Sequence, residues 1–292
     1  MGSDSPLDSF TLVDGGRLLL WAALLLPLAS RGEVSADWLG ADQFEFGTPT
    51  AMRVNELYLR DPHVFLQTPF GCVDFTDNPI PFTQISFNSQ IADALNGDSN
   101  PADGFLDASS LLLFRPASRT DGSPQRLDLV AGDCIAPVAG TSCTNALGVD
   151  PAIDSYLSSS AGSCLQALGG TTSGYSPGLP TMGSPCWLTR PADRLLDAQG
   201  VTVPLSDAQQ GGQWSGAGII QGLQRGFLSE AAAEQILLPN PLPGQPPIVL
   251  ASLLPGGAGS CASGDDRDQH AGQSGWWFYL QFSAGEVSYV AP

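Results

Sequence analysis

Short apolar stretches recur along the chain, several with the two-residue period typical of β-strands that bury one face. In residues 54–66, for example, Leu57 and Leu59 share one face, and Asp61-Pro62 interrupts the run because proline cannot donate to a strand ladder. Further apolar runs lie at 111–114, 127–131, 201–205, 217–228 and 276–282. Most of them end at Gly, Pro, Asp or Ser, so the pattern predicts many strands joined by turns.

Composition strengthens this interpretation, since 34 Gly and 24 Pro disfavour long helices. We expect a mainly β protein, a two-sheet sandwich of the jelly-roll type with one or two short helices and disulfide-stapled loops. The clearest helix is predicted at 229–238, with Ser229 as N-cap and Pro239 after its end. A second short helix is expected at 248–254, and a turn or two at 85–95.

The segment 132–191 is rich in Ser, Gly, Thr and Pro and holds four of the six cysteines. Because an even set of cysteines in an exported chain indicates disulfides, we interpret this segment as a long loop region stapled by local bridges. The expected pairs are Cys134 with Cys143, Cys164 with Cys186, and Cys72 with Cys261. The last pair would tie the front of the domain to its end.

Residues 18–29, LLLWAALLLPLA, follow Arg17 and precede the small residues of Val34-Ser35-Ala36. This is the pattern of a secretory signal peptide, and the apolar core is short for a permanent membrane span. We therefore expect a leader and signal peptide at 1–36 and a single mainly β domain at 37–292. The protein would be secreted, periplasmic or at the cell surface, meeting the membrane only during export. The alternative is an uncleaved membrane anchor.

The net charge of −18 narrows the choice of partners. All eleven basic residues are Arg, and they form no cluster that could offset the repulsion of phosphates. Nucleic acid and anionic lipid are therefore disfavoured, whereas divalent cations, a glycan or another neutral surface ligand are favoured. With 42% apolar residues the chain should fold, and its oligomeric state stays open.

The strongest candidate ligand site is the segment 96–107, NGDSNPADGFLD. Its oxygen-bearing side chains belong to Asn96, Asp98, Asn100, Asp103 and Asp107. The run 103–107 resembles the middle of an EF-hand or dockerin-type loop, in which alternate acids surround calcium and a glycine makes the sharp turn. Pro101-Ala102 departs from this pattern as an insertion, and Ser110 replaces the bidentate acid. The resemblance implies calcium as a stabilising cofactor; the alternative is a polar hairpin turn.

The richest apolar strand is predicted at 276–282, WWFYLQF. Its two-residue period places Trp276, Phe278, Leu280 and Phe282 on a core face and Trp277 with Tyr279 on the other. An exposed indole and phenol could stack on a sugar ring, which makes Trp277 and Tyr279 candidate ligand-binding residues. The alternative is a strand covered on both faces.

Residues that could perform catalysis are few. The acids of 265–268, or a serine paired with His63 or His270, could serve a hydrolase. Residues 174–178, GYSPG, match the nucleophile-elbow expression around Ser176, although neither a buried strand nor a helix is predicted beside them. Our preferred hypothesis is therefore a non-catalytic binding or structural protein. The alternative is a secreted hydrolase that acts on polysaccharide or ester.

Overall fold

The computed structural model describes residues 48–81, 83–140, 142–148, 151–162, 164–198, 201–216, 218–239 and 245–291. The leader and signal peptide predicted for 1–36 lie outside the described residues. So does the proposed start of the folded domain, at residues 37–47.

Strands dominate the described chain, with one helix of ten residues and two very short ones. The strands are β1 (Thr50–Asp61), β2 (Phe65–Thr68), β3 (Gly71–Asp74), β4 (Ser110–Arg115), β5 (Gln125–Cys134), β6 (Ser142–Asn145), β7 (Ala152–Ser159), β8 (Cys186–Thr189), β9 (Ala192–Ala198), β10 (Val201–Trp214), β11 (Gly218–Ser229), β12 (Leu237–Leu238), β13 (Ile248–Val249), β14 (Asp268–His270) and β15 (Gln273–Tyr289). The helices are α1 (Phe87–Asn96), α2 (Glu230–Ala233) and the 3-10 turn η4 (Leu250–Leu253).

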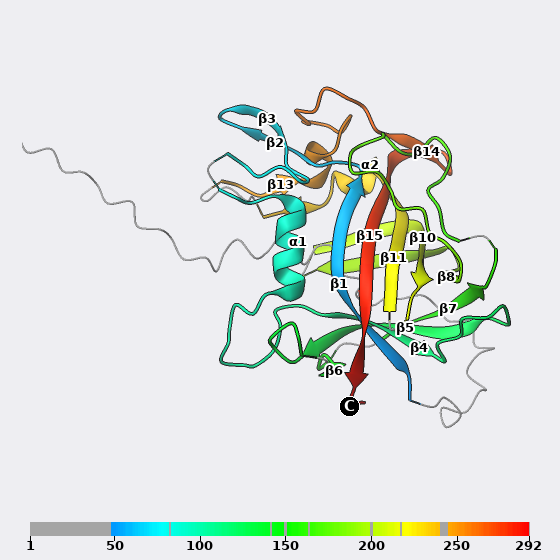
Figure 1. Cartoon of the computed structure of the whole chain (residues 1–292). Helices are drawn as coiled ribbons and strands as arrows, with labels where there is room; N and C mark the ends of the chain where they lie inside the picture. The colour runs from blue at the N-terminus through cyan, green and yellow to red at the C-terminus, as the bar shows by residue number, and fades with distance from the viewer. Residues whose placement is uncertain are drawn as a thin grey trace, which may run out of the picture.

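The main sheet closes on itself. Eight strands form the ring β1-β4-β5-β7-β8-β10-β11-β15, and each is antiparallel to both neighbours. In Figure 1, β1 and β15 run side by side where the ring closes. The predicted mainly β class is confirmed, but the predicted two-sheet sandwich is wrong. The reason is that β15 pairs with β1 along one side and β11 along the other, so the sheet does not divide in two.

The ring also uses strands from the segment that we expected to be loops. Both β7 and β8 lie within 132–191, and β7 joins β5 to β8. Only two of the eight residues of β7, Ala152 and Tyr156, are buried, and its other side chains are mostly polar. An apolar pattern was therefore too weak to reveal this strand.

Aromatic and aliphatic side chains from all eight ring strands fill the barrel as one buried cluster. Phe114 packs on Trp187 and Trp214, with ring centroids 5.1 and 4.8 Å away. The predicted core face of the last strand is confirmed, since Trp276, Phe278, Leu280 and Phe282 all join this cluster. Close packing also explains Gly222, because a Cβ there would lie 2.4 Å from the Phe282 ring. The interior is a packed core.

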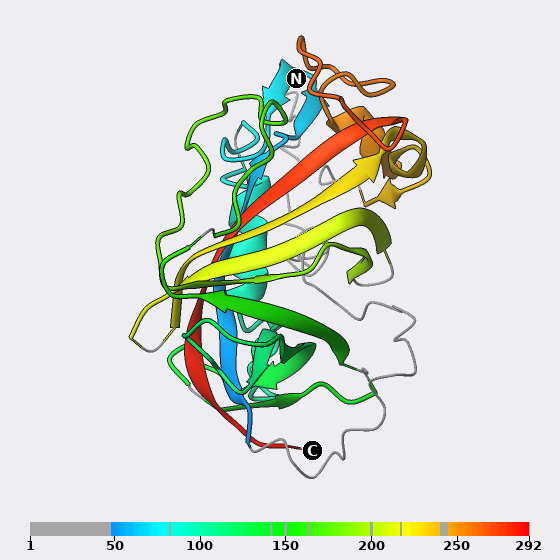
Figure 2. The same ribbon diagram turned by 90° about the vertical axis from the view of Figure 1, so that its right-hand side faces the viewer.

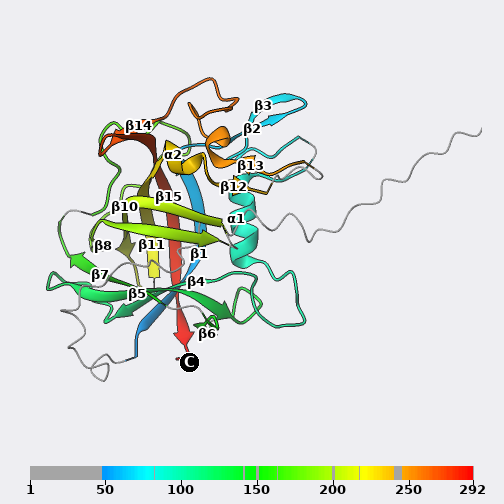
Figure 3. The ribbon, with the colours of Figure 1, turned by 180° about the vertical axis from the view of Figure 1, so that it is seen from behind.

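Helix α1 lies against β1, as Figures 1 and 3 show from opposite sides. It begins with a capping box, in which Ser86 and Ser89 satisfy each other's backbone N–H groups. The Asn88 side chain accepts a hydrogen bond from the Leu59 N–H and donates to the Leu59 carbonyl. This helix is longer than the turn or two expected at 85–95, since α1 has ten residues and ends at Asn96.

The other two helix predictions were too long. The helix expected at 229–238 has the predicted N-cap, Ser229, but α2 ends at Ala233 and the chain then forms β12. The helix expected at 248–254 divides into the short strand β13 and the 3-10 turn η4. Among the described helices, none is both long and apolar enough to cross a lipid bilayer.

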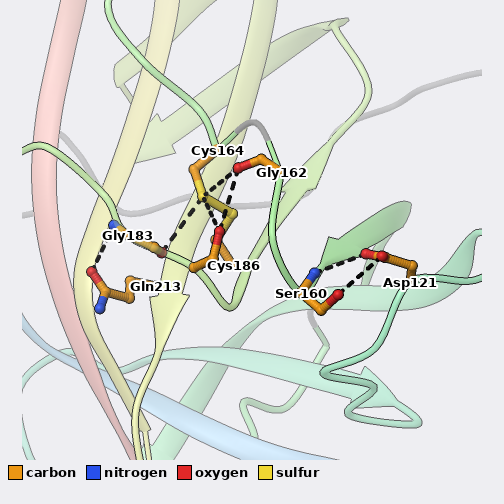
Figure 4. Close-up of a disulfide and its surroundings, with 8 residues drawn as sticks. Asp121, Ser160, Gly162, Cys164, Gly183, Cys186 and Gln213 are labelled. Carbon is orange, nitrogen blue, oxygen red and sulfur yellow. Dashed lines mark hydrogen bonds between the residues drawn. A yellow bond between two sulfur atoms is a disulfide. The ribbon is translucent and has the colours of Figure 1, made fainter.

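Three disulfides staple the barrel, and all three expected pairs are present: Cys72–Cys261, Cys134–Cys143 and Cys164–Cys186. Figure 4 shows the third, which lies beside the Gly183 N–H and its acceptor, the Gln213 side chain. This bridge bounds residues 164–184, which we call the covering loop. Three bridges indicate an oxidising environment outside the cytoplasm.

Candidate functional site

A cleft of about 240 Å³ opens where β9 and β10 meet the end of β11 and α2. Its apolar lining comes from Leu195, Pro204, Leu205, Phe227 and Ala232, and its polar lining from Asp193, Arg194, Ser206 and Ser229. Concave sites with apolar walls and a few fixed polar groups are the usual form of small-molecule pockets. The cleft is therefore the first candidate binding site. Figure 3 shows this side of the barrel.

A bulge in β10 shapes the cleft. The register of β10 shifts against both β9 and β11 between Leu205 and Gln209. Asp207, inside the bulge, has φ +48°, a left-handed conformation uncommon for a residue with a side chain. Its carboxylate lies 2.7 Å from Nε2 of His270, and its backbone N–H donates to the Asp193 carboxylate at 3.3 Å. These contacts hold the bulge from two sides.

His270 is thus placed beside the cleft in an anchoring position. Its ring packs on Phe227, a residue of the cleft, and on Trp277, with centroids 5.0 and 4.9 Å away. Because its Nε2 is paired with Asp207, no described serine completes a Ser/His pair through this nitrogen. The structure therefore gives His270 a role in fixing the bulge.

Arg194 supplies the most unusual polar group of the cleft. Its side chain is only 5% exposed, and its guanidinium forms an ion pair with Asp154 of β7. Its Nε, however, is buried and has no hydrogen-bond partner within the described residues. A buried donor without a partner costs about 1–3 kcal/mol.

Trp277 and Tyr279 do not form the exposed aromatic platform that made them candidate ligand-binding residues. Trp277 is 4% exposed and Tyr279 is fully buried, because the covering loop packs on their face through Leu165 and Met182. The Tyr279 hydroxyl also accepts from the Leu168 N–H at 3.1 Å. Figure 2 shows this loop running along the outside of the strands. The alternative, a strand covered on both faces, is confirmed.

A second histidine cluster lies at the end of β1. His63 is buried, and its Nδ1 lies 2.7 Å from the Asp74 carboxylate of β3. Its ring stacks on Tyr175 of the covering loop, with centroids 3.7 Å apart and planes 8° apart. The Tyr175 hydroxyl donates in turn to Asp266. The cluster therefore joins three segments: the β2–β3 hairpin, the covering loop and the loop before β14.

Protonation in this cluster is unusual at Asp61, the last residue of β1. Burial raises the pKa of Asp61 to about 6, and the nearby charge of Asp266 adds to this effect, although the Ser173 N–H donates to the carboxylate at 2.7 Å. The pKa of Asp74 is lowered: burial alone would raise it, but the hydrogen bond and charge of His63 outweigh burial. The two carboxyls therefore titrate in different pH ranges.

The arrangement lacks the geometry of a serine hydrolase. Nε2 of His63 is buried and has no hydrogen-bond partner in the described ranges, so no described serine donates to it. Ser176 lies in an irregular part of the covering loop, so the strand and helix of a nucleophile elbow are missing around it. Asp265 is exposed and pairs with Arg267, whose hydrogen bonds lower the pKa of that carboxyl to about 2.

Asn96, the first predicted calcium ligand, is the last residue of α1, and the other four lie in the loop after it. Protein donors already occupy several of these side chains. Oδ1 of Asn96 accepts from the Arg53 guanidinium at 3.2 Å, and Asp107 accepts from the Ser99 backbone N–H and hydroxyl. Asn100 and Asp103 bond each other, and Asp103 also accepts from the Phe105 N–H. One oxygen of Asp98 is buried without a partner among the described residues. No group of three or more His, Cys, Asp or Glu side chains in the described chain is arranged to hold a metal.

Comparison of the chain with protein-family models, curated proteins and solved structures gives no match. The class of protein is therefore defined by its fold alone: a closed antiparallel eight-stranded barrel with a packed interior and three disulfides. Its candidate functional features are the cleft and the surroundings of His63 and His270.

Sequence reasoning missed the cleft, since no motif marks Arg194 or Ser206 as neighbours. Arg194 lies opposite Leu205 in the β9–β10 register, and the hairpin itself was not predicted in full. Reasoning from the sequence did identify His63 and His270 as residues of interest. The structure pairs His63 with Asp74 of β3.

Proposed function

We propose that this protein is an exported, disulfide-bonded and non-catalytic binding protein whose ligand site is the cleft between β9, β10 and α2. The observation that carries this proposal is a mostly apolar cleft of about 240 Å³ whose lining holds a few fixed polar side chains. Secretion is supported by the signal-like segment 18–29 and by the three disulfides.

The packed interior supports a ligand site on the outside of the barrel. Wide barrels can hold a small ligand in the lumen, but here buried side chains from all eight ring strands fill it. The covering loop shares a buried cluster with Phe227 of the cleft lining, which stiffens this wall of the cleft. A stiff frame favours binding because less conformational entropy is lost when the ligand is held.

The alternative, a secreted hydrolase for polysaccharide or ester, has weaker support. It would need a base that can reach a substrate, and geometry is the first requirement for such a base. His63 is covered by the ring of Tyr175, and Nε2 of His270 is held by Asp207. Asp61 is 4% exposed, which places its carboxyl away from solvent.

Ligand-observed NMR on the full exported chain tests the proposal. A set of uncharged single-ring fragments should show saturation transfer, and Leu195→Trp should abolish it by filling the cleft. Ile220→Trp is the matched control, because Leu195 and Ile220 are exposed strand residues, 40% and 53% accessible, and only Leu195 lines the cleft. Absence of transfer to every fragment, or transfer that survives Leu195→Trp, would overturn the proposal.

A further inference from the structure

We infer that residues 172–178 of the covering loop form a strap that lies closed over the Asp61 carboxyl in mildly acidic solution and opens as the pH rises to neutral. The strap opens because an ionised carboxyl gains water when its cover is lifted. None of the residues of the strap lines the cleft, so the proposed ligand site is not involved.

The two ends of the covering loop are anchored by contacts outside the strap. Leu165 and Met182 are buried in one cluster with Trp277, and the Cys164–Cys186 bridge ties the loop to β8. These anchors are apolar or covalent, so a change of pH between 4 and 8 leaves them intact. A segment that is held at both ends can still move in its middle.

The strap is fastened to the barrel through ionisable side chains. The Ser173 N–H donates to the Asp61 carboxylate at 2.7 Å. The Tyr175 ring stacks on His63, and its hydroxyl donates to Asp266. Within the described chain, residues 172–178 form no backbone-to-backbone hydrogen bond. The gain or loss of a proton at one of these partners can therefore decide whether the strap stays closed.

Acidic side chains dominate the surroundings of Asp61. The titratable groups that face it or lie opposite it are His63 after β1, Asp266 before β14, Asp268 of β14, Tyr175 of the strap and Tyr279 of β15. Burial raises the pKa of both phenols, so they stay uncharged up to neutral pH. His63 is already paired with Asp74. An ionised Asp61 would therefore add a negative charge beside two other carboxyls.

Two effects of ionisation oppose each other at Asp61. A charged carboxylate accepts the Ser173 N–H more strongly, which would tighten the strap. Burial and the charge of Asp266 act the other way and are larger, since the pKa of Asp61 lies at about 6 instead of 3.8. Lifting the strap lets water solvate the carboxylate and returns its pKa towards the ordinary value. Opening therefore becomes up to about 60-fold more favourable between pH 4 and pH 7.5.

Hydrogen exchange of the Ser173 amide, followed by NMR on the full exported chain, tests the strap. The protection factor of this amide, corrected for the intrinsic exchange rate at each pH, should fall by about ten- to sixtyfold between pH 4 and pH 7.5. The Leu168 amide is the reference in the same loop, because it donates to the Tyr279 hydroxyl at an anchored end. Its protection should change by less than about threefold.

Two variants assign the effect to one carboxyl. Asp61→Asn keeps an acceptor for the Ser173 N–H but cannot ionise, so the protection of Ser173 should no longer depend on pH. Asp121→Asn is the matched control, because the exposed Asp121 carboxylate accepts the Ser160 N–H at 2.8 Å outside the covering loop (Figure 4). This control should keep the full fall in protection at Ser173.

Three results would overturn the inference: constant protection of Ser173 in the unmodified chain, an equal fall at Leu168, or a fall that survives Asp61→Asn. An equal fall at both amides would mean that the whole loop or the whole barrel opens, so that 172–178 is no separate strap. If Asp61→Asn does not fold, as circular dichroism will reveal, the comparison of Ser173 with Leu168 in the unmodified chain decides the inference alone.

Discussion

The imidazole of His63 lies flat on the phenol ring of Tyr175, although 111 intervening residues separate them in the chain. His63 lies two residues after the end of β1, and Tyr175 belongs to the covering loop, so the stack fastens that loop to the end of the barrel. The Tyr175 hydroxyl extends the contact to Asp266. Tyr175 thus holds the covering loop against both the end of β1 and the loop before β14.

Removal of the stack should loosen the covering loop. Tyr175→Leu loses the ring and should lower the free energy of unfolding by about 1–3 kcal/mol. Tyr175→Phe keeps the ring and loses only the bond to Asp266, so its effect should be smaller. Thermal unfolding and limited proteolysis within 164–184 measure both. Equal losses in the two variants would contradict a role for stacking.

Stability should depend on pH through Asp61. Its folded-state pKa of about 6 exceeds the ordinary value of 3.8, so the native chain binds the extra proton between these values. The contribution of protonated Asp61 to the free energy of unfolding is therefore fully present below about pH 4. It is lost as the pH rises through 6, a change of about 2–3 kcal/mol. Asp61→Asn should remove this fall and raise stability at pH 7.

Denaturant unfolding at pH 4, 5, 6 and 7 checks this expectation. The exposed Glu234 offers a matched control as Glu234→Gln, which should leave the pH profile unchanged. A profile for Asp61→Asn that parallels the unmodified chain would show that Asp61 does not carry the effect.

The longest and the shortest disulfide links should differ in their contribution to stability. Cys72–Cys261 spans 189 residues and Cys134–Cys143 only 9. In the chain-entropy account, loss of the long link costs about 5 kcal/mol and loss of the short link about 2–3 kcal/mol. Paired Cys→Ser substitutions and denaturant titration measure the order. A larger loss from the short link would contradict the entropic account for this chain.

Trp277 should behave as a core residue. Trp277→Ala removes a large buried side chain from the cluster beneath the covering loop and should cost about 3–5 kcal/mol. Titration of glycans should leave the tryptophan fluorescence of the unmodified chain unchanged. A fluorescence change with a glycan that disappears in a folded Trp277→Phe variant would restore the sugar-binding hypothesis.

Calcium binding by the loop 96–107 stays a prediction with a direct test. If the cation binds, about 1 mM calcium should raise the melting temperature relative to a chelator, because extracellular modules bind in this range. Asp98→Asn should remove the increase, since this residue has the buried, unpartnered oxygen. The exposed Glu286 provides the control as Glu286→Gln. Identical melting curves with calcium and with chelator would show that the loop is a polar turn that does not bind the cation.

The strand content could be predicted because apolar periodicity is a local property. The core face of β15, from Trp276 to Phe282, and the N-cap Ser229 followed directly from such patterns. Barrel closure could not be predicted, because it depends on β15 pairing with two partners and on the mostly polar strand β7. The disulfide pairs, chosen on the expectation that neighbouring cysteines bridge locally, are present.

The site was harder to predict than the fold. The burial of Trp277 depends on a loop more than 90 residues earlier in the chain, which no local pattern reveals. The cleft depends on a register shift near Asp207, and such a shift has no distinct signature in residue types. Local patterns identify elements, whereas sites depend on how distant elements meet.

The pairing of β1 with β15 sets an order of events during synthesis. Ala51 faces Val287 across this pair, so the barrel cannot close until almost the whole chain has been made. Contacts between such distant segments slow folding. The emerging polypeptide consequently remains unclosed until its last strand has been translated.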